Sequence, residues 1–207
     1  MNLEKVYRAR NLIEIAKSFE GQRDRGDAPV DVEVEVLRHK SKSKKDLGEV
    51  SPAAGGRLFR PGDFISFRVK NNSLLAVDLT LLIVGSDFEI QPFYPLLRNG
   101  EVAKSLKPGE TIDTPWPWGG ISNKPPFGSE CLVVIAVPET TPPADFSALA
   151  QDGLARSRSA DKGNSLKSPL GELLESAMFR SKSRSVLPRT VAVQHGMRVL
   201  TFRTEAK

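Results

Sequence analysis

Two histidines and one cysteine are the residues of this 207-residue chain whose side chains most often serve catalysis. A hydrolytic site needs a nucleophile, a base and an orienting acid within hydrogen-bond reach. His39 lies in the basic stretch RHKSKSKK, for which we expect a loop, and His195 lies beside Gly196 in the expected final strand. Cys131 heads the apolar run CLVVIAV, where a thiolate is poorly stabilised. The pattern favours a buried structural thiol and an ordinary strand histidine over a Cys131–His195 dyad.

Metal and cofactor sites have no signature in the sequence. Two separated histidines and one cysteine do not make a zinc site without carboxylates from elsewhere, and Asp24, Asp27, Asp87 and Asp113 do not have calcium-loop spacing. No glycine-rich phosphate loop or dinucleotide fingerprint is present. We therefore expect no metal, no cofactor and no catalytic residues, so that the protein is not an enzyme.

Trp116 and Trp118 are the most informative aromatic pair. Both lie in PWPWGGISNKPPFG, for which we expect a loop, and Phe127 lies nearby. An exposed aromatic loop is a candidate contact site for a partner. The alternative is that the indoles cover the open end of the fold, and the sequence leaves both interpretations open.

The chain carries a net charge of +5 and has a pI of about 9.4. The excess of cations lies in three stretches rich in serine, residues 38–45, 156–167 and 180–189. Surfaces that bind nucleic acid usually pair cations with stacking aromatics or a recognition helix, and these stretches have few aromatics. We interpret them as solvated loops. The alternative function is a basic module that binds nucleic acid or another polyanion.

The chain must place these residues on a framework of short strands. Residues 2–19 predict an amphipathic helix that Gly21 ends, and residues 30–36 alternate valine with acids, as a half-buried strand does. After the Pro61–Gly62 turn, residues 65–69, 75–83 and 88–94 predict a meander of strands. Residues 131–137 predict a central strand buried on both faces.

The last third of the chain is not predicted to consist of strands alone. Residues 145–151 and 168–179 predict two helices, and residues 190–204 predict a last strand. Together the elements predict a mainly β fold, an Ig-like antiparallel β-sandwich with an N-terminal helix and one or two helices at its edges in the C-terminal half. We expect one domain over 1–207, with a packing helix (1–20), a sandwich core (28–137), a helical and loop insertion (138–188) and a final strand (189–204).

No apolar run is long enough to span a bilayer, and the charged N-terminus is not that of a secretory signal. One cysteine fits a reducing compartment. We therefore expect a cytoplasmic protein that makes no membrane contact.

The order of the turn motifs is more specific than any one of them. The stretch LFRPGDFISFRVKNNSLLAVDLTLLIVGSDFEIQPFYP, then LKPGE, then PPFGSECLVVIAV, resembles the DUF4384 family. Those domains are rich in β-structure and usually lie carboxy-terminal to a peptidase or kinase domain, often a bacterial caspase-like (metacaspase-type) peptidase. The helices predicted over ARNLIEIAK and SPLGELLESAMF also resemble the flanks of such domains.

The resemblance implies a non-enzymatic accessory or regulatory domain that acts by protein–protein contact. The implied partner is a protein, a caspase-like peptidase or its target. Peptidases of that type generally cut after arginine or lysine. This makes Arg156, Arg158, Lys162, Arg180, Lys182 and Arg184 candidate processing sites, and a solvated linker is the alternative for these loops.

Overall fold

The computed structural model of the chain describes residues 2–23, 30–43, 45–51, 57–95, 104–121, 125–154, 170, 174 and 195–206. These residues form α1 (Asn2–Arg23), β1 (Val32–His39), β2 (Glu49–Val50), β3 (Leu58–Phe59), β4 (Phe64–Asn71), β5 (Val77–Val84), β6 (Ile90–Tyr94), β7 (Thr111–Gly120), β8 (Ser129–Pro138), the 3-10 turn η1 (Ser147–Leu149) and β9 (Gly196–Thr204). Within these ranges, no helix is long and apolar enough to cross a membrane.

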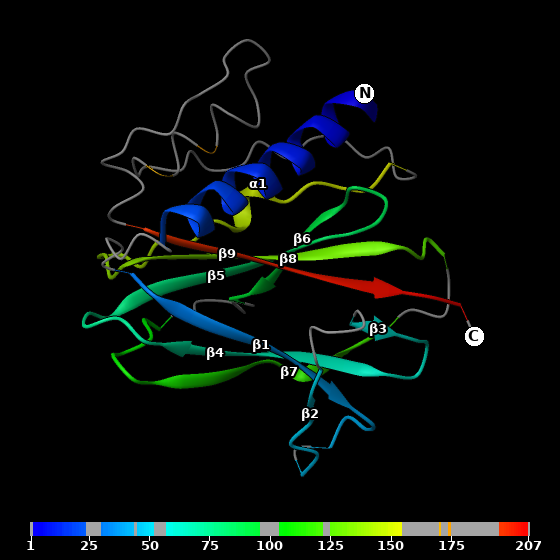
Figure 1. Ribbon diagram of the computed structural model, residues 1–207, viewed down its shortest axis with the longest axis horizontal. Helices are drawn as coiled ribbons and strands as arrows, with labels where there is room; N and C mark the ends of the chain where they lie inside the picture. The colour runs from blue at the N-terminus through cyan, green and yellow to red at the C-terminus, as the bar shows by residue number, and fades with distance from the viewer. Residues whose placement is uncertain are drawn as a thin grey trace.

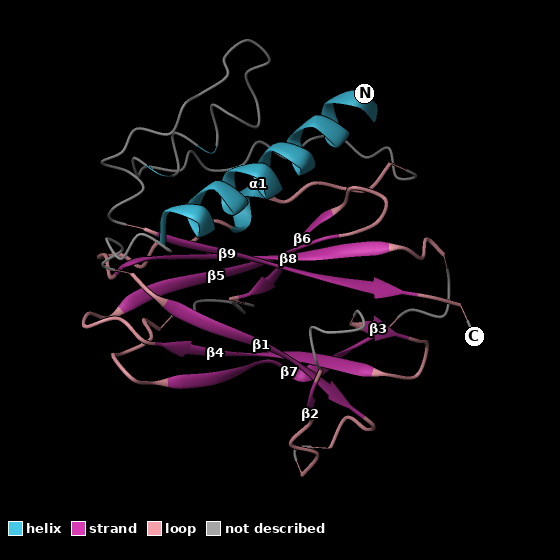
Figure 2. Cartoon of the chain, viewed as in Figure 1, coloured by secondary structure: helices cyan, strands magenta, loops and turns pink. Residues whose placement is uncertain are grey.

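The strands form two stacked sheets, and α1 adds a third layer (Figure 1). Sheet A has the strand order β2-β1-β4-β7, and sheet B has the order β3-β9-β8-β5-β6. Figure 2 shows α1 lying over the outer face of sheet B, where it contacts β9 and β8. The predicted mainly β sandwich with an N-terminal helix is therefore confirmed. The Ig-like subtype stays a prediction.

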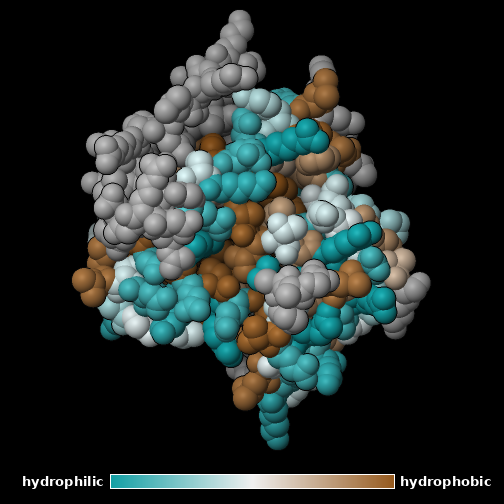
Figure 3. Space-filling view, viewed as in Figure 1, coloured by the Kyte–Doolittle hydropathy of each residue, from teal (hydrophilic) through white to brown (hydrophobic). Residues whose placement is uncertain are grey.

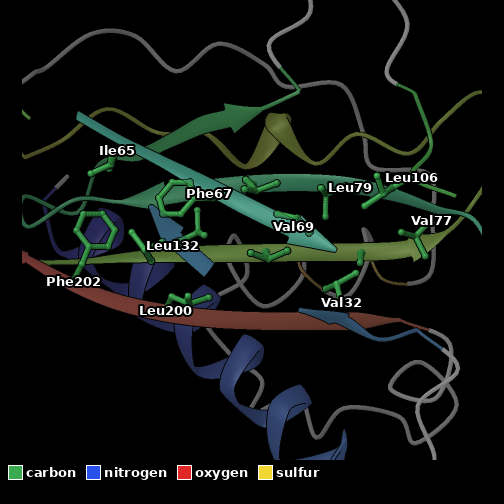
Figure 4. Close-up of a cluster of buried hydrophobic side chains, with 14 of the residues drawn as sticks. Val32, Ile65, Phe67, Val69, Val77, Leu79, Leu106, Leu132, Leu200 and Phe202 are labelled. Carbon is green, nitrogen blue, oxygen red and sulfur yellow. The ribbon is translucent and has the colours of Figure 1, made fainter. Parts of the chain in front are cut away.

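Two clusters of buried apolar side chains hold the three layers together. In the cluster between the sheets, side chains from β4, β5, β8 and β9 point toward one another (Figure 4). Phe59 meets Phe202 edge to face there, with ring centroids 5.9 Å apart, a geometry that adds about 0.5–1.5 kcal/mol beyond area burial. The second cluster packs α1 on sheet B through Ala9, Leu12, Ala16 and Phe19, which recur at helical spacing and are at most 4% exposed.

Strand β8 lies at the centre of sheet B, as its apolar sequence predicted. Residues 132–137 are all buried, because alternate side chains face the α1 layer and the space between the sheets. Strand β5 is also buried on both faces. Leu82 packs toward α1 while Leu81 packs between the sheets.

β4 and β5 lie in different sheets, so the predicted meander is wrong at this point. β4 pairs with β1 and β7, whereas β5 pairs with β6 and β8. The buried Asn71 stabilises the crossing between the sheets, because its amide donates to the carbonyl oxygens of Leu75 (2.9 Å) and Leu106 (2.8 Å). The sequence pattern of two consecutive strands that alternate apolar and polar residues is the same whether the strands pair in one sheet or lie in two sheets that face each other.

Asp78 anchors the segment that follows β8 to the buried strand β5. It is 3% exposed. Its carboxylate accepts hydrogen bonds from the hydroxyl of Ser105 (2.8 Å), the N–H and hydroxyl of Thr140 (both 2.9 Å) and the N–H of Ala144 (2.8 Å). A buried charge is tolerated when it is satisfied in this way.

The helical predictions need two corrections. α1 continues through Gly21 to Arg23, so Gly21 does not end it. The helix predicted over 145–151 is only the turn η1. The helix predicted over 168–179 lies outside the described residues except for Leu170 and Leu174, which are helical and fully buried in the cluster with α1. The final strand is confirmed from Gly196 onward, and residues 189–194 lie outside the described ranges.

Candidate interaction surface

The register of sheet B separates the two residues considered for a catalytic dyad. Cys131 pairs with Thr201 near the start of β8, whereas Ala136, five residues further along, pairs with Gly196, the neighbour of His195. Five residues of a strand span about 17 Å, far beyond hydrogen-bond reach. The two side chains do not form a nucleophile–base pair.

His39 belongs to a buried hydrogen-bond network and not to the predicted loop. It is the last residue of β1, and its side chain is fully covered. Its Nε2 lies 2.7 Å from the hydroxyl of Ser66 on β4, and its Nδ1 lies 3.0 Å from the backbone oxygen of Asp46. The first distance suits a nucleophile and its base, but Ser66 is 0% exposed, so a substrate has no access to its hydroxyl here. The network instead ties the β1–β2 connection to sheet A.

Asp46 orders that connection. Its carboxylate accepts the backbone N–H groups of Lys40 (2.8 Å), Ser41 (2.9 Å) and Gly48 (3.1 Å). Burial opposes ionisation, but these hydrogen bonds and the nearby His39 hold the pKa of Asp46 below its ordinary value. A Cβ on Gly48 would lie 2.6 Å from the His39 ring, so glycine is required. The described side chains of this ordered hairpin that are exposed are Lys40, Ser41, Lys42, Ser43, Lys45, Leu47, Glu49 and Val50.

Trp116 and Trp118 lie in strand β7 and not in the loop predicted for them. The ladder between β4 and β7 breaks there, because four residues of β7, 115–118, stand opposite Ser66 alone. The structure describes only the backbone of these four residues. Phe127 is partly buried and lies just before β8, a strand of sheet B, whereas β7 belongs to sheet A. A joint contact surface of Trp116, Trp118 and Phe127 stays a prediction.

The six candidate processing residues, Arg156, Arg158, Lys162, Arg180, Lys182 and Arg184, lie outside the described residues, and their cleavage stays a prediction. In the part of the chain that the structure describes, no three His, Cys, Asp or Glu side chains gather in a way that could hold a metal ion.

The outer edges of β7 and β6 are poorly suited to an added strand. Pro115 and Pro117 remove two backbone donors from β7. In β6, Ile90 exchanges both backbone hydrogen bonds with Gln151 (2.9 and 3.0 Å), and Pro92 follows within the strand. Native sheets use prolines and covering segments of this kind to block edge-to-edge pairing.

The outer edge of β9 is covered by its own chain. The N–H of Val199 donates to the carboxylate of Glu20 in α1 at 2.8 Å. The carbonyl oxygen of Thr201 accepts from the Arg57 guanidinium at 3.4 Å, and the N–H of Arg203 donates to the Arg57 oxygen at 2.8 Å. Outward backbone groups of Val199, Thr201 and Arg203 on this edge are therefore already bonded.

The outer edge of β1 differs. Val36 accepts the N–H of Ser51 at 2.8 Å on the side away from β4, so Val32, Val34 and Val36 all direct their backbone groups outward. The oxygen of Val32 accepts from Nε of Arg198 at 3.1 Å. The N–H and C=O of Val34 have no partner among the residues that the structure describes. Unpaired groups in the middle of an edge strand are a template for pairing with another chain.

Two arginines bridge the sheets at the two ends of this edge. Arg198 of β9 reaches β1 as described, and Arg38 of β1 donates to the carbonyl oxygen of Leu58 in β3. Between them lie the partly exposed Val34 and the 8% exposed Leu200. Figure 3 shows apolar surface over β9 and in the hollow between β9 and β1, with hydrophilic side chains on both sides. We call the backbone edge of residues 32–36, with Val34 and Leu200 behind it, the open flank.

Comparisons with known proteins add little to this geometry. No protein-family model and no curated protein matches the chain. Among solved structures, the chain is similar to a crystal structure of a protein described as ApaA, from Bordetella pertussis, with 18% sequence identity and a TM-score of 0.27. The similarity covers 54% of this chain and 83% of that chain. A similarity of this size does not indicate a function.

Sequence patterns identified β1 as a strand but missed its role at the open flank. The run DVEVEV, without proline or lysine, was the available signal, because edges that avoid pairing usually carry one or the other. The bridging roles of Arg38 and Arg198 left no signal, since each depends on which strand lies opposite.

Proposed function

We propose that this chain is a non-catalytic protein-interaction module that binds an extended segment of a partner protein at the open flank. The observation that carries the proposal is the backbone of Val34, whose N–H and C=O face outward in mid-strand without a partner in the described part of the chain. The neighbouring Val32 and Val36 also direct their N–H groups outward.

Strand addition uses these groups for affinity and the adjoining pockets for selectivity. Each new backbone hydrogen bond contributes about 0.5–1.5 kcal/mol net. Val34 and Leu200 provide an apolar surface behind the added strand, and burying it adds a second favourable term. Arg198 and Arg38 limit the site to the short stretch between them.

The partner that we propose is a caspase-like peptidase or its target, on the strength of the resemblance of the turn motifs to DUF4384. A non-catalytic role is supported by the covered hydroxyl of Ser66 and by the separation of Cys131 from His195. Trp116 and Trp118, on the opposite edge of sheet A, are kept as a separate candidate contact.

Selection of ligands from a displayed library of random peptides tests this function without a known partner. Selected peptides should bind the wild-type chain, bind the Val34→Ala variant somewhat more weakly because part of the apolar surface is lost, and lose binding to Val34→Pro. Proline removes the outward N–H of Val34 and no hydrogen bond to β4, and Val34→Ala controls for the lost side chain. Circular dichroism and the thermal midpoint of each variant report whether it folds.

A second arm leaves the protein unchanged. Each selected peptide is remade with N-methyl groups on one or the other alternate set of amides. Only the set that faces β1 should abolish binding, because the other set points away from the sheet. Ligands that bind Val34→Pro normally, tolerate both methylated sets, and depend on Trp116 and Trp118 would overturn the proposal in favour of the β7 surface.

A further inference from the structure

The outer face of sheet A carries charges that alternate in sign from strand to strand. Asp113 of β7, Arg68 of β4 and Glu35 of β1 are direct cross-strand neighbours. Arg68 makes two hydrogen bonds to Asp113 (2.9 and 3.0 Å) and lies 3.8 Å from Glu35. The hydrogen bond to Asp113 is the main cause of a raised pKa of the Arg68 guanidinium; burial opposes the rise, and the charges of Asp113 and Glu35 add to it. From β7 to β1, the charges in this row are therefore negative, positive and negative. The row ends with the acid Glu35 at the open flank.

A parallel row has the same ending. Lys70 of β4 stands opposite Glu33 of β1. Glu33 and Glu35 point to the same face of β1, because side chains two residues apart share a face. Asp31 lies two residues before Glu33, just ahead of β1, and so belongs to the same face. It already has a cation from the other sheet, since Arg198 lies 3.3 Å from its carboxylate. The acids beside the open flank thus favour a cation at the next strand position.

A second copy of this chain does not satisfy that requirement. In an antiparallel pairing of two β1 edges centred on Val34, Glu33 of each copy stands opposite Glu35 of the other. Shifting the register by two residues in either direction again places acid opposite acid. Like charges directly opposite each other destabilise a strand pair. The edge is therefore unsuited to self-association.

We infer that the segment bound at the open flank carries lysine or arginine at every second position, with apolar residues between them. This inference rests on the proposed function. In the added strand, the cations lie beside Glu33 and Glu35 on the outer face. The alternate side chains turn toward the hollow where Val34 and Leu200 lie. The partner is thus an extended peptide with the pattern cation, apolar, cation, apolar.

The test uses a short labelled peptide in which lysine and valine alternate, and a second peptide of the same composition with its lysines consecutive. Binding is measured by fluorescence anisotropy at moderate salt. We expect the alternating peptide to bind about tenfold more tightly, because a run of lysines that reaches both acids also turns a lysine toward the apolar hollow. The double variant Glu33→Gln/Glu35→Gln should lose about the same factor. The double variant Glu4→Gln/Glu14→Gln, an equal charge change at two exposed positions of α1, is the matched control and should leave binding unchanged.

A third peptide, alternating threonine and valine, separates the two proposals, with the backbone amide signal of Val34 in nuclear magnetic resonance spectra as the readout. If all three peptides shift the Val34 signal with equal affinity, strand addition stands and the charge inference is overturned. If the two lysine peptides bind equally and the Glu33→Gln/Glu35→Gln variant binds as wild type, the charge inference is also overturned. If no peptide shifts the Val34 signal, the proposed function itself fails.

Discussion

Nε of Arg198 in sheet B lies 3.1 Å from the backbone oxygen of Val32 in sheet A, so a side chain of one sheet caps the edge of the other. The same guanidinium lies 3.3 Å from the carboxylate of Asp31. Close by, Gly196 approaches Val30 so tightly that a Cβ would lie 2.9 Å from the valine side chain. The sandwich is therefore fastened at the start of β1, and the open flank begins immediately beyond this point.

Arg198→Met should destabilise the fold by about 1–3 kcal/mol, because it removes a charged donor from the oxygen of Val32 and the ion pair with Asp31. Methionine keeps most of the apolar stem. Urea unfolding measures the change. Arg203→Met is the control, since its ion pair with Glu205 is largely exposed and contributes little. Equal losses in the two variants would show that Arg198 does not fasten the sheets.

Ser66→Ala should cost about 1–3 kcal/mol, because it removes the hydrogen bond at Nε2 of His39 inside a covered site. The loss should also speed hydrogen exchange at the amides of Lys40 and Gly48, which belong to the hairpin that the network holds. Lys45→Met, at an exposed position of the same hairpin, should change neither. Unchanged exchange in Ser66→Ala would contradict the role given to His39.

Asp46 should make the fold less stable in acid. Its pKa is lowered in the folded state, so its contribution is present above the pKa of the unfolded chain and is lost as pH falls through the folded value. Asp46→Asn should therefore be less stable than wild type at neutral pH, and the difference should shrink below the ordinary pKa of aspartate. Glu139→Gln, at an exposed position, is the control. Thermal midpoints across this pH range would contradict the assignment if the difference stayed constant.

Cys131 should react slowly with iodoacetamide at neutral pH. Burial raises the pKa of its thiol; the hydrogen bond with Thr201 and the charge of Lys17 oppose the rise, and the charge of Glu130 adds the smallest contribution to it. Only the thiolate is a strong nucleophile. The pH at which alkylation reaches half its maximal rate should lie above that of a cysteine in the urea-unfolded chain. Equal midpoints in the folded and unfolded chain would contradict this.

The amino-acid sequence predicted which residues form strands better than it predicted which strands pair. The apolar run 131–137 predicted a central strand because burial on both faces leaves a direct mark on composition. The pairing of β4 with β1 and β7, and not with β5, left no such mark. For the same reason, the sequence placed His39, Trp116 and Trp118 in loops, whereas His39 ends β1 and both tryptophans lie in β7. Polar and proline-rich runs resemble loops unless the partner strand is known.

The candidate site shows the same limit. Alternating valines and acids predicted that one face of β1 is buried, which the structure confirms for Val32 and Val36. Whether the backbone edge is free depends on how far β2 extends along β1, and β2 pairs only with Leu37 and Arg38. That length depends on the residues that follow β2 and not on the sequence of β1 itself.

Hydrogen exchange of individual amides along β1, followed by nuclear magnetic resonance in the intact chain, tests the central claim most directly. The amides of Glu33 and Glu35 bond to β4 and should be protected, whereas the amide of Val34 should exchange rapidly. Addition of a bound peptide ligand should then protect Val34. A Val34 amide protected as strongly as those of Glu33 and Glu35 in the free chain would show that the edge is already occupied and would contradict the proposed function.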